Sequence, residues 1–292
     1  MDRVNGADFV DIGGGRRGFR SQNLGAGVSG TEVTDVWLNA VQENLMKVIE
    51  EAGLEPDADD WTLLWQALRR SSTRVSQSII TGSGTYIPHS GLLMVDVEIV
   101  GGGAGGGGSY GAASPNVSPA SGGSGAGYSR RFYTAEELGA SAAVVIGAAG
   151  IGGTGQVSGG DGGTSTFTPA GSGIAMTALG GIGGFFGPTY TKIARGESIS
   201  PGGGATGGQI NVAGTPSGWP LAFGGTEYQA ISGRGGNSQL GVGGQEANEN
   251  NNGNAGSGYG AGGGGAASLT VSKTGANGTA GACFVTEYWR IE

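Results

Sequence analysis

The pattern of apolar and polar positions is clearest from Leu92 to Val100, directly before a run of glycines. In the string LLMVDVEIV, the branched residues Val95, Val97 and Ile99 alternate with polar neighbours, which predicts a strand with one face on a core. Positions 101–108 are all glycine except for one alanine. Glycine buries no side chain and costs roughly 0.5–1 kcal/mol more backbone entropy than alanine. We therefore expect the backbone itself to hold this part together, either as polyproline-II-like segments bonded to one another or as turns between strands.

The pattern of a strand followed by glycines recurs along the chain. Further strands are expected at 128–134, 142–146, 164–167, 174–179 and 279–289. Residues 182–260 lack this regularity, gather aromatic side chains, and are expected to form loops. The predicted fold is mainly β, with glycine-rich, polyproline-II-like or loop segments. It forms one domain from residue 86 to residue 292, in which 183–260 is a variable loop region.

The first third of the chain has helical periodicity instead. Apolar residues at spacings of three or four predict a helix that Thr31 or Thr34 caps and Gly53 ends, with a core face of Trp37, Val41, Leu45, Val48 and Ala52. A second helix is expected after Pro56, with Trp61, Leu64, Trp65 and Leu68 on one face. These helices predict a small hairpin domain at 31–75, between an extended arm at 1–30 and a linker at 76–85. Its tryptophan-rich face indicates burial against sister chains or a partner, although an ordinary hairpin core is the alternative.

Composition excludes several classes of protein. The chain has 68 glycines in 292 residues, but no three-residue repeat runs through it, which excludes collagen. The recurring apolar strands argue against disorder. The formal charge of −8 argues against nucleic-acid binding, and the single cysteine excludes an intrachain disulfide. No apolar stretch approaches ~18 residues and no signal peptide opens the chain, so we expect no membrane insertion.

Catalytic and metal-binding patterns are missing from the sequence. One histidine and one cysteine cannot build a zinc site or a Ser-His-Asp arrangement, and no phosphate-binding Gly-Lys-Ser/Thr string occurs. We expect His89 to be a turn residue. A glycosidase that uses two carboxylates is formally possible, with the candidates Asp161, Glu197, Glu227 and Glu246. Since nothing in the sequence brings any two of them together, we expect no enzyme, no cofactor and no metal.

The N-terminal region resembles a known family. The string VDIGGGRRGFR at 10–20, followed by GTEVT at 30–34 and a helix that contains WLN and QE, is similar to the N-terminal region of bacteriophage tail fibres and related prophage proteins. In those proteins this end attaches to the tail or baseplate. The candidate tail-attachment residues are Arg16, Arg17, Phe19 and Arg20, because guanidinium groups bind acidic or carbonyl partners on a neighbouring protein. A flexible leader is the alternative.

The glycine-rich part has a second resemblance. Residues 86–108, 131–150, 159–181 and 278–288 contain a proline turn, a strand into polyglycine, a return strand ending in Gly-x-x-Gly, a Gly-Gly-Thr-Ser-x-Phe-like segment and a closing strand ending in Glu-Tyr. This order resembles the glycine-rich tip domain of phage tail fibres and adhesins. The resemblance implies a receptor-binding protein of the virion, made in the host cytoplasm and located at the tail tip, in a homotrimeric fibre.

Two functions follow as hypotheses. In the first, the N-terminus attaches to tail or baseplate proteins, and aromatic side chains on the tip loops bind a bacterial surface glycan or pilus. The candidate receptor-binding residues are Trp219, Tyr190, Tyr228 and Phe186. For Phe186 and its neighbours, filling gaps in the core is the alternative. In the second hypothesis, the protein is a purely structural baseplate or fibre component without direct receptor binding. Capsule degradation is a weaker third hypothesis.

Overall fold

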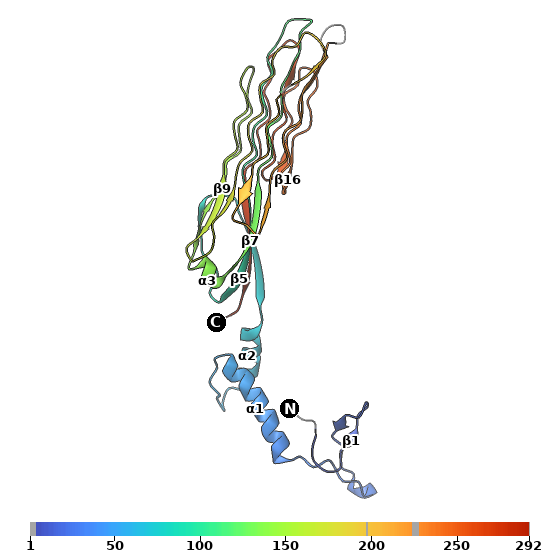
Figure 1. Ribbon diagram of the computed structural model, residues 1–292. Helices are drawn as coiled ribbons and strands as arrows, with labels where there is room; N and C mark the ends of the chain where they lie inside the picture. The colour runs from blue at the N-terminus through green and yellow to red at the C-terminus, as the bar shows by residue number, and fades with distance from the viewer. Residues whose placement is uncertain (1–3, 197, 224–227, 292) are drawn as a thin grey trace. The chain divides into compact units, whose positions relative to one another are not determined.

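The computed structural model describes residues 4–196, 198–223 and 228–291. The chain forms two compact units, one of residues 1–73 with 290–292 and one of residues 74–289. The smaller unit contains two helices, α1 (Asp35–Glu51) and α2 (Leu63–Ser71) (Figure 1). The larger unit contains nearly all of the strands and all of the long glycine runs.

The helix boundaries follow from local capping. The Thr34 side chain accepts a hydrogen bond from the Trp37 N–H at 3.3 Å, and Gly53, with φ of +70°, follows the end of α1. The second helix begins at Leu63, later than the position after Pro56 that the sequence indicated. Asp60 accounts for the delay, because its carboxylate accepts hydrogen bonds from both the N–H and the hydroxyl of Thr62, at 2.8 and 2.6 Å.

The helical hairpin buries only part of the expected faces, since Ala52 and Leu64 pack against its core and the tryptophans do not. Its buried core consists of Ile49, Leu63 and Ala67, whereas Trp61 is 94% exposed and Trp65 is 63% exposed. Trp61 lies before α2, and Trp65 lies roughly 200° around the helix from Leu63, so neither can join that core. Leu45 and Val48 on α1 are also exposed. The tryptophan-rich face is therefore unburied within one chain.

Residues 4–30 do not form a single extended arm. Strands β1 (Val10–Asp11) and β2 (Arg17–Gly18) pair as a short hairpin, and the 3₁₀ turn η1 (Leu24–Ala26) follows. The Thr31 N–H donates to the carbonyl of Arg20 at 3.1 Å, which folds this segment back on itself. The expected extended arm is thus replaced by a folded loop structure.

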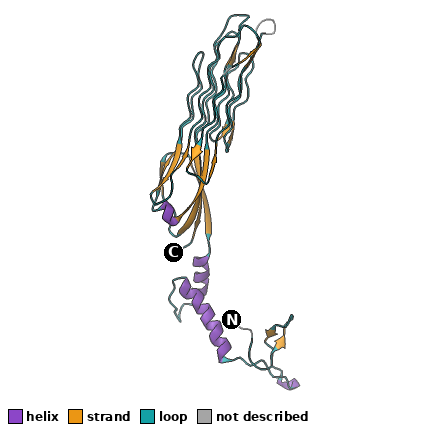
Figure 2. Ribbon diagram, in the orientation of Figure 1, coloured by secondary structure: helices purple, strands orange, loops and turns teal. Residues whose placement is uncertain are grey.

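The larger unit has a base of two antiparallel sheets (Figure 2). The first sheet has the order β13–β7–β5–β19–β3, with bounds Ile210–Val212, Tyr128–Thr134, Leu92–Val100, Ala282–Trp289 and Arg74–Ile80. The second has the order β12–β10–β9–β8–β4, with bounds Ala205–Thr206, Met176–Ala178, Ser165–Pro169, Ala142–Val145 and Gly84–Tyr86. The short helix α3 spans Ala135–Leu138.

These sheets confirm the mainly β fold predicted from the sequence. The long strand into the glycine run and the closing strand pair with each other, as Val97 opposite Val285 shows. Residues 76–85, expected as a linker, instead contribute most of β3 and the first two residues of β4. They join the sheets because β3 pairs with β19 along its whole length, from Arg74 to Ile80.

A hydrophobic core fills the space between the two sheets. Val95, Val97 and Ile99 are fully buried, as the period of two predicts, and pack with Tyr133 and Phe167. Cys283 also lies in this core, where burial raises the pKa of its thiol to about 12. The thiol therefore stays protonated and unreactive at neutral pH.

A buried carboxylate ties the two sheets together. Glu287 on β19 is 5% exposed and accepts hydrogen bonds from the hydroxyl of Tyr86 on β4 and, at 3.2 Å, from that of Ser76. His89 also contacts it through Nδ1 and stacks on Trp289 at 4.7 Å. Burial raises the pKa of Glu287, but the hydrogen bonds from Tyr86, His89 and Ser76 lower it by more, so the net pKa lies below 4.5. His89 therefore links its turn to the closing strand.

Beyond the strands, the glycine-rich segments form a bundle held by main-chain hydrogen bonds with a repeat of three (Figure 2). Along residues 101–109, the N–H groups donate in rotation to segments 121–127, 157–163 and 273–279, at 2.8 to 3.2 Å. The carbonyls of 102–108 accept in rotation from three other segments, at 2.8 to 3.1 Å. A strand would bond with a period of two, so this rotation is that of a polyproline-II helix with three residues per turn.

Three segments lie at the centre of the bundle and the others enclose them. The central segments, 101–109, 119–127 and 260–266, bond to one another and are buried at every position. Among the described residues, the outer segments are 147–153, 157–163, 179–187, 200–204, 214–218, 232–236, 243–247, 252–254 and 273–281. Successive outer segments bond side by side, and the last bonds to the first through Gly275, Gly278 and Gly281, which closes the ring.

Residues 183–260 are therefore not simply a variable loop region. They supply five of the outer segments, from 200–204 to 252–254, and the start of a central one. Many of their glycines lie where an added Cβ would meet the backbone of a neighbouring segment, as Gly214 and Gly235 do. The segment 179–187 shows the local repeat: Leu179, Ile182 and Phe185 are exposed, while the glycine pairs between them face the bundle.

At the end of the bundle away from the sheets, loops form a tip. Val117, Ala222, Ala230, Ala267 and Leu269 form a small buried core there. Short strands frame it: β6 (Ser118–Pro119) pairs with β18 (Ala267–Ser268), and β14 (Leu221–Phe223) lies between β11 (Ala194–Arg195) and β15 (Gln229–Ile231). At the other end of the bundle, near the sheets, β16 (Gly241–Val242) pairs with β17 (Ser257–Gly258).

Adding a side chain to a central segment should unfold the larger unit. A Cβ at Gly105 would lie 2.1 Å from the carbonyl oxygen of Ile151, and one at Gly106 would lie 2.0 Å from that of Gly264. We expect Gly105→Val to lower the free energy of unfolding by about 3 kcal/mol or more, because backbone cannot yield as a side chain can. Urea unfolding measures this loss. The matched control is Gly204→Ala, where the nearest atom is a Leu179 methyl at 3.9 Å, and an equal loss in both variants would contradict the close-packing argument.

Acid should weaken the link at Glu287. Because its pKa is lower in the folded chain than in the unfolded chain, its stabilisation is complete above about 4.5 and is lost as the pH falls through the folded-state value. We expect wild type to be more stable than Glu287→Gln at neutral pH and the difference to shrink below about pH 4.5. Urea unfolding of both proteins from about pH 7 to about pH 3 tests this. A difference independent of pH would show that the charge of Glu287 does not contribute.

Candidate functional site

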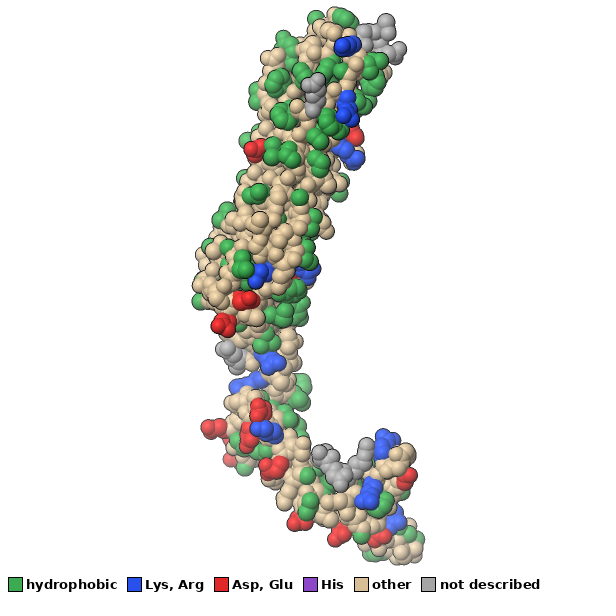
Figure 3. Space-filling view, in the orientation of Figure 1, with side chains coloured by type: hydrophobic (Ala, Val, Ile, Leu, Met, Phe, Trp, Pro, Cys, Tyr) green, Lys and Arg blue, Asp and Glu red, His purple; other side chains and the backbone are tan. Residues whose placement is uncertain are grey.

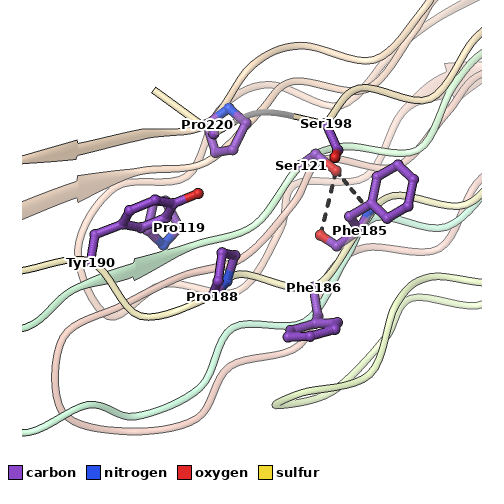
Figure 4. Close-up of a pocket in the computed structure, with 9 residues that line it drawn as sticks. Pro119, Ser121, Phe185, Phe186, Pro188, Tyr190, Ser198 and Pro220 are labelled. Atoms are coloured by element: carbon purple, nitrogen blue, oxygen red, sulfur yellow. Dashed lines mark hydrogen bonds between the residues drawn. The ribbon is translucent and has the colours of Figure 1, made fainter. Parts of the chain in front are cut away.

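A groove of about 410 Å³ lies where the tip loops meet the bundle (Figure 4). Its lining is mostly ring-bearing or small: Pro119, Ser121, Phe185, Phe186, Pro188, Tyr190, Gly196, Ser198 and Pro220. Pro119 and Ser121 come from a central segment, and 185–190 continue an outer segment into the tip. The bundle thus positions the floor and one wall of the groove, while a tip loop supplies Pro220.

Hydrogen bonds within the protein already use most main-chain N–H groups of the groove. The N–H of Phe185 donates to the Ser121 hydroxyl at 2.7 Å, and that of Phe186 donates to the Ser158 hydroxyl at 3.2 Å. The N–H groups of Tyr190 and Gly196 donate to the carbonyls of Val117 and Pro220, at 2.8 and 2.9 Å. The three lining prolines have no N–H. The groove therefore offers ring faces and side-chain groups rather than main-chain donors.

Two of the four predicted receptor-binding residues, Phe186 and Tyr190, line this groove. Phe186 is 40% exposed and lines it, and Tyr190 lines it while packing against the tip core. Trp219, 37% exposed, directly precedes the wall residue Pro220, and the Arg195 guanidinium lies 4.0 Å from its ring centroid. Successive side chains of an extended segment point to opposite sides, so Trp219 does not face the groove as Pro220 does, and the aromatic lining comes from residues 185–190 alone.

Tyr228, the fourth predicted residue, has a different setting. It adopts a positive φ of 49° and packs against the tip core, half-buried. Its hydroxyl is buried and has no hydrogen-bond partner among the described residues. Tyr228 therefore supports the tip loops from within rather than lining the groove.

The predicted tail-attachment residues are partly engaged within the smaller unit. Arg20 pairs with Asp8 at 2.9 Å, and Arg16 donates to the carbonyl of Gly13 at 2.8 Å. The Arg17 guanidinium lies 4.4 Å from the ring centroid of Phe9. Phe19, 48% exposed, packs edge-on against Trp37 at 5.0 Å. These contacts fix the folded N-terminal segment and leave Arg16 and Arg17 at its surface.

The acidic candidates for glycoside cleavage do not form a pair. Asp161 accepts a hydrogen bond from the N–H of Gly183 at 2.8 Å, a contact between outer segments, and Glu246 is exposed elsewhere on the ring. Glu197 and Glu227 lie outside the described residues. Within the part of the chain that the structure describes, no cluster of three or more His, Cys, Asp or Glu could hold a metal, and no helix is long and apolar enough to span a membrane.

With this geometry in place, the bundle can be compared with known families. A family model described as a glycine-rich domain matches residues 78–288. The chain belongs to this glycine-rich domain family. The match covers both sheets and the whole bundle, so this glycine-rich domain begins within β3 and ends within β19. A comparison with curated proteins gave no match.

Sequence reasoning missed several residues of the groove in this glycine-rich domain. Pro119, Pro188 and Pro220 lie far apart in the chain. Prolines close to aromatic residues, as in Phe186-Gly-Pro188 and Trp219-Pro220, are the sequence signal that could have indicated them. Figure 3 shows that hydrophobic and cationic side chains gather toward the tip of the glycine-rich unit, whereas much of its middle shows backbone and small side chains.

Proposed function

We propose that this protein is a bacteriophage or prophage tail fibre protein that binds a host surface receptor through the tip of its glycine-rich domain. The observation that carries the proposal is the aromatic groove at the tip, built on a bundle whose central glycines pack directly against neighbouring backbone. Binding residues on loops that a rigid scaffold positions are typical of recognition proteins. The receptor is a bacterial surface glycan or pilus.

The smaller unit is the proposed attachment to the tail or baseplate. Its N-terminal segment presents Arg16, Arg17 and Phe19 at the surface, and guanidinium groups suit carboxylate or carbonyl partners on a neighbouring protein. The exposed apolar residues of the hairpin, chiefly Trp61, Trp65 and Leu68, favour contact between copies of the chain. A homotrimer is the proposed assembly.

Loss of the groove rings should weaken adsorption to cells. We expect the double variant Phe186→Ala, Tyr190→Ala to bind receptor-bearing bacteria at least roughly tenfold more weakly, because buried aromatic anchors dominate binding energy. Labelled full-length protein is titrated onto a panel of bacterial strains and the apparent Kd is measured by flow cytometry.

The control for adsorption is Ile151→Ala, which removes a side chain that is 72% exposed on an outer segment away from the groove. It should bind as wild type does. Equal binding by the double variant would place recognition on another surface. No binding of wild type to any strain would favour a structural fibre component.

The hairpin face should control assembly. We expect light scattering to give three times the chain mass for wild type and a smaller assembly for Trp61→Ser, Trp65→Ser, since burial of these indoles would stabilise the contact between chains. Leu24→Ser, which changes a residue that is 77% exposed in the same unit, should leave the mass unchanged. A monomeric wild type would refute the homotrimer.

A further inference from the structure

The two five-stranded sheets have four edge strands, and one of these is much longer than the others. β13, β4 and β12 have three, three and two residues, whereas β3 has seven, from Arg74 to Ile80. Natural sheets limit pairing at their edges with short strands, lysines, prolines or bulges. β3 has none of these, because its sequence is RVSQSII and it pairs with β19 without a register shift. Its free edge is therefore open to another strand.

This free edge carries both main-chain and apolar groups. Every second residue of an antiparallel edge strand points its N–H and C=O groups away from the sheet. Within the described part of the chain, residues 74–80 make no main-chain hydrogen bond outside the pairing with β19. Ile80 packs against the core, so Val75 and Ile79, 58% and 55% exposed, lie on the opposite face. The edge thus presents unpaired main-chain groups beside exposed branched side chains.

An edge of this kind selects an extended polypeptide, because an added strand satisfies the main-chain groups of both partners. The charge of β3 narrows the chemistry of that strand. Only Arg74 is charged, at one end, where its guanidinium lies 5.8 Å from the Trp289 ring centroid. Apolar cross-strand neighbours suit Val75 and Ile79, and small polar ones suit the serines between them. The complementary segment is therefore uncharged, with apolar residues at alternate positions.

Sister chains of the proposed homotrimer do not supply this segment. Strand edges pair two at a time, so the β3 edges of three equivalent copies would leave one unpaired. The edges β13, β4 and β12 are too short to match seven residues. β3 also begins three residues after α2 ends, at the point in the chain where the proposed attachment unit gives way to the larger unit. These observations favour a strand from the protein to which the chain attaches.

We propose that the free edge of β3 binds an extended segment of the tail or baseplate protein and adds it to the first sheet as a sixth strand. The segment pairs along Arg74–Ile80, and its apolar side chains cover Val75 and Ile79. This inference rests on the proposed attachment function and identifies a second surface for it, besides the folded N-terminal segment.

The first test measures binding of a synthetic strand to the full-length chain. The probe is a fluorescent peptide of the β3 sequence, because VSQSI at 75–79 is nearly symmetrical and an antiparallel pair would place valine opposite Ile79 and isoleucine opposite Val75. Its anisotropy during titration gives the Kd. A peptide with methylated main-chain amides should bind at least roughly tenfold more weakly, because it cannot donate hydrogen bonds to the edge.

Proline variants of the chain test the edge directly. Of the adjacent residues Gln77 and Ser78, one donates its N–H to β19 and the other points it away from the sheet. We therefore expect one of Gln77→Pro and Ser78→Pro to unfold at lower temperature, and the other to stay folded but bind the peptide at least roughly tenfold more weakly. The matched controls Gln77→Ala and Ser78→Ala keep the N–H and should bind as wild type does.

Assembly tests the identity of the partner. Phage particles are purified from cells that make either the wild-type chain or the folded proline variant, and the chain on them is measured by immunoblot. We expect the variant to be lost from the particles and its alanine control to be retained. Equal amounts of wild type and proline variant would refute docking at β3 while the attachment function stands. Absence of wild type from the particles would refute the attachment itself.

Three peptide results would also overturn the inference. These are no binding of the unmodified peptide, equal binding of the methylated peptide, and undiminished binding by the folded proline variant. Gln77→Cys tests for a second copy at the edge, since symmetrical antiparallel pairing would place residue 77 of two copies opposite each other. A disulfide-linked dimer that forms faster than in Ile210→Cys, an exposed site on the short edge β13, would replace the tail protein with a second copy.

Discussion

Main-chain hydrogen bonds between segments that consist mostly of glycine hold this protein's glycine-rich domain together. Along 101–109 each N–H turns to one of three neighbours in rotation, and the carbonyls turn to three others. A net contribution of about 1 kcal/mol for each hydrogen bond must offset a glycine entropy cost of roughly 0.5–1 kcal/mol per residue. A central segment meets this condition because its N–H and C=O groups find hydrogen-bond partners in six neighbouring segments. One segment alone would have only water as its partner, so the bundle must form as a unit.

This constraint also decides where chemistry can occur. From Leu179 to Phe185, glycine occupies the two positions of three that face neighbouring segments, and the side chains of Leu179, Ile182 and Phe185 project from the third. The bundle therefore carries few side chains on its surface, and it can rarely bring several of them together at one site. Loops at its end are free of the restriction, and there Phe186, Tyr190 and Pro220 line one groove.

The sequence predicted those parts whose signal is local. The alternation at Val95, Val97 and Ile99 and the closing strand through Val285 were both correct, because a period of two is visible in a few residues. The extent of the bundle within 183–260 was not predicted, since a glycine in an outer segment and one in a turn look alike. Its partners lie far away: Gly103 bonds to Thr279, and Arg195 meets Trp219 across a strand pair. Such contacts depend on three-dimensional register that no local pattern records.

The two sheets set that register for the bundle. The central segment 101–109 continues β5, the segment 119–127 leads into β7, and the outer segment 273–281 leads into β19. These three strands are neighbours in one sheet, and Glu287 ties that sheet to Tyr86 of the other. The sheets therefore fix the alignment of the bundle segments from the end opposite the tip. Substitutions in the tip loops leave this source of order untouched, so the loops can vary in sequence without unfolding the backbone that supports them.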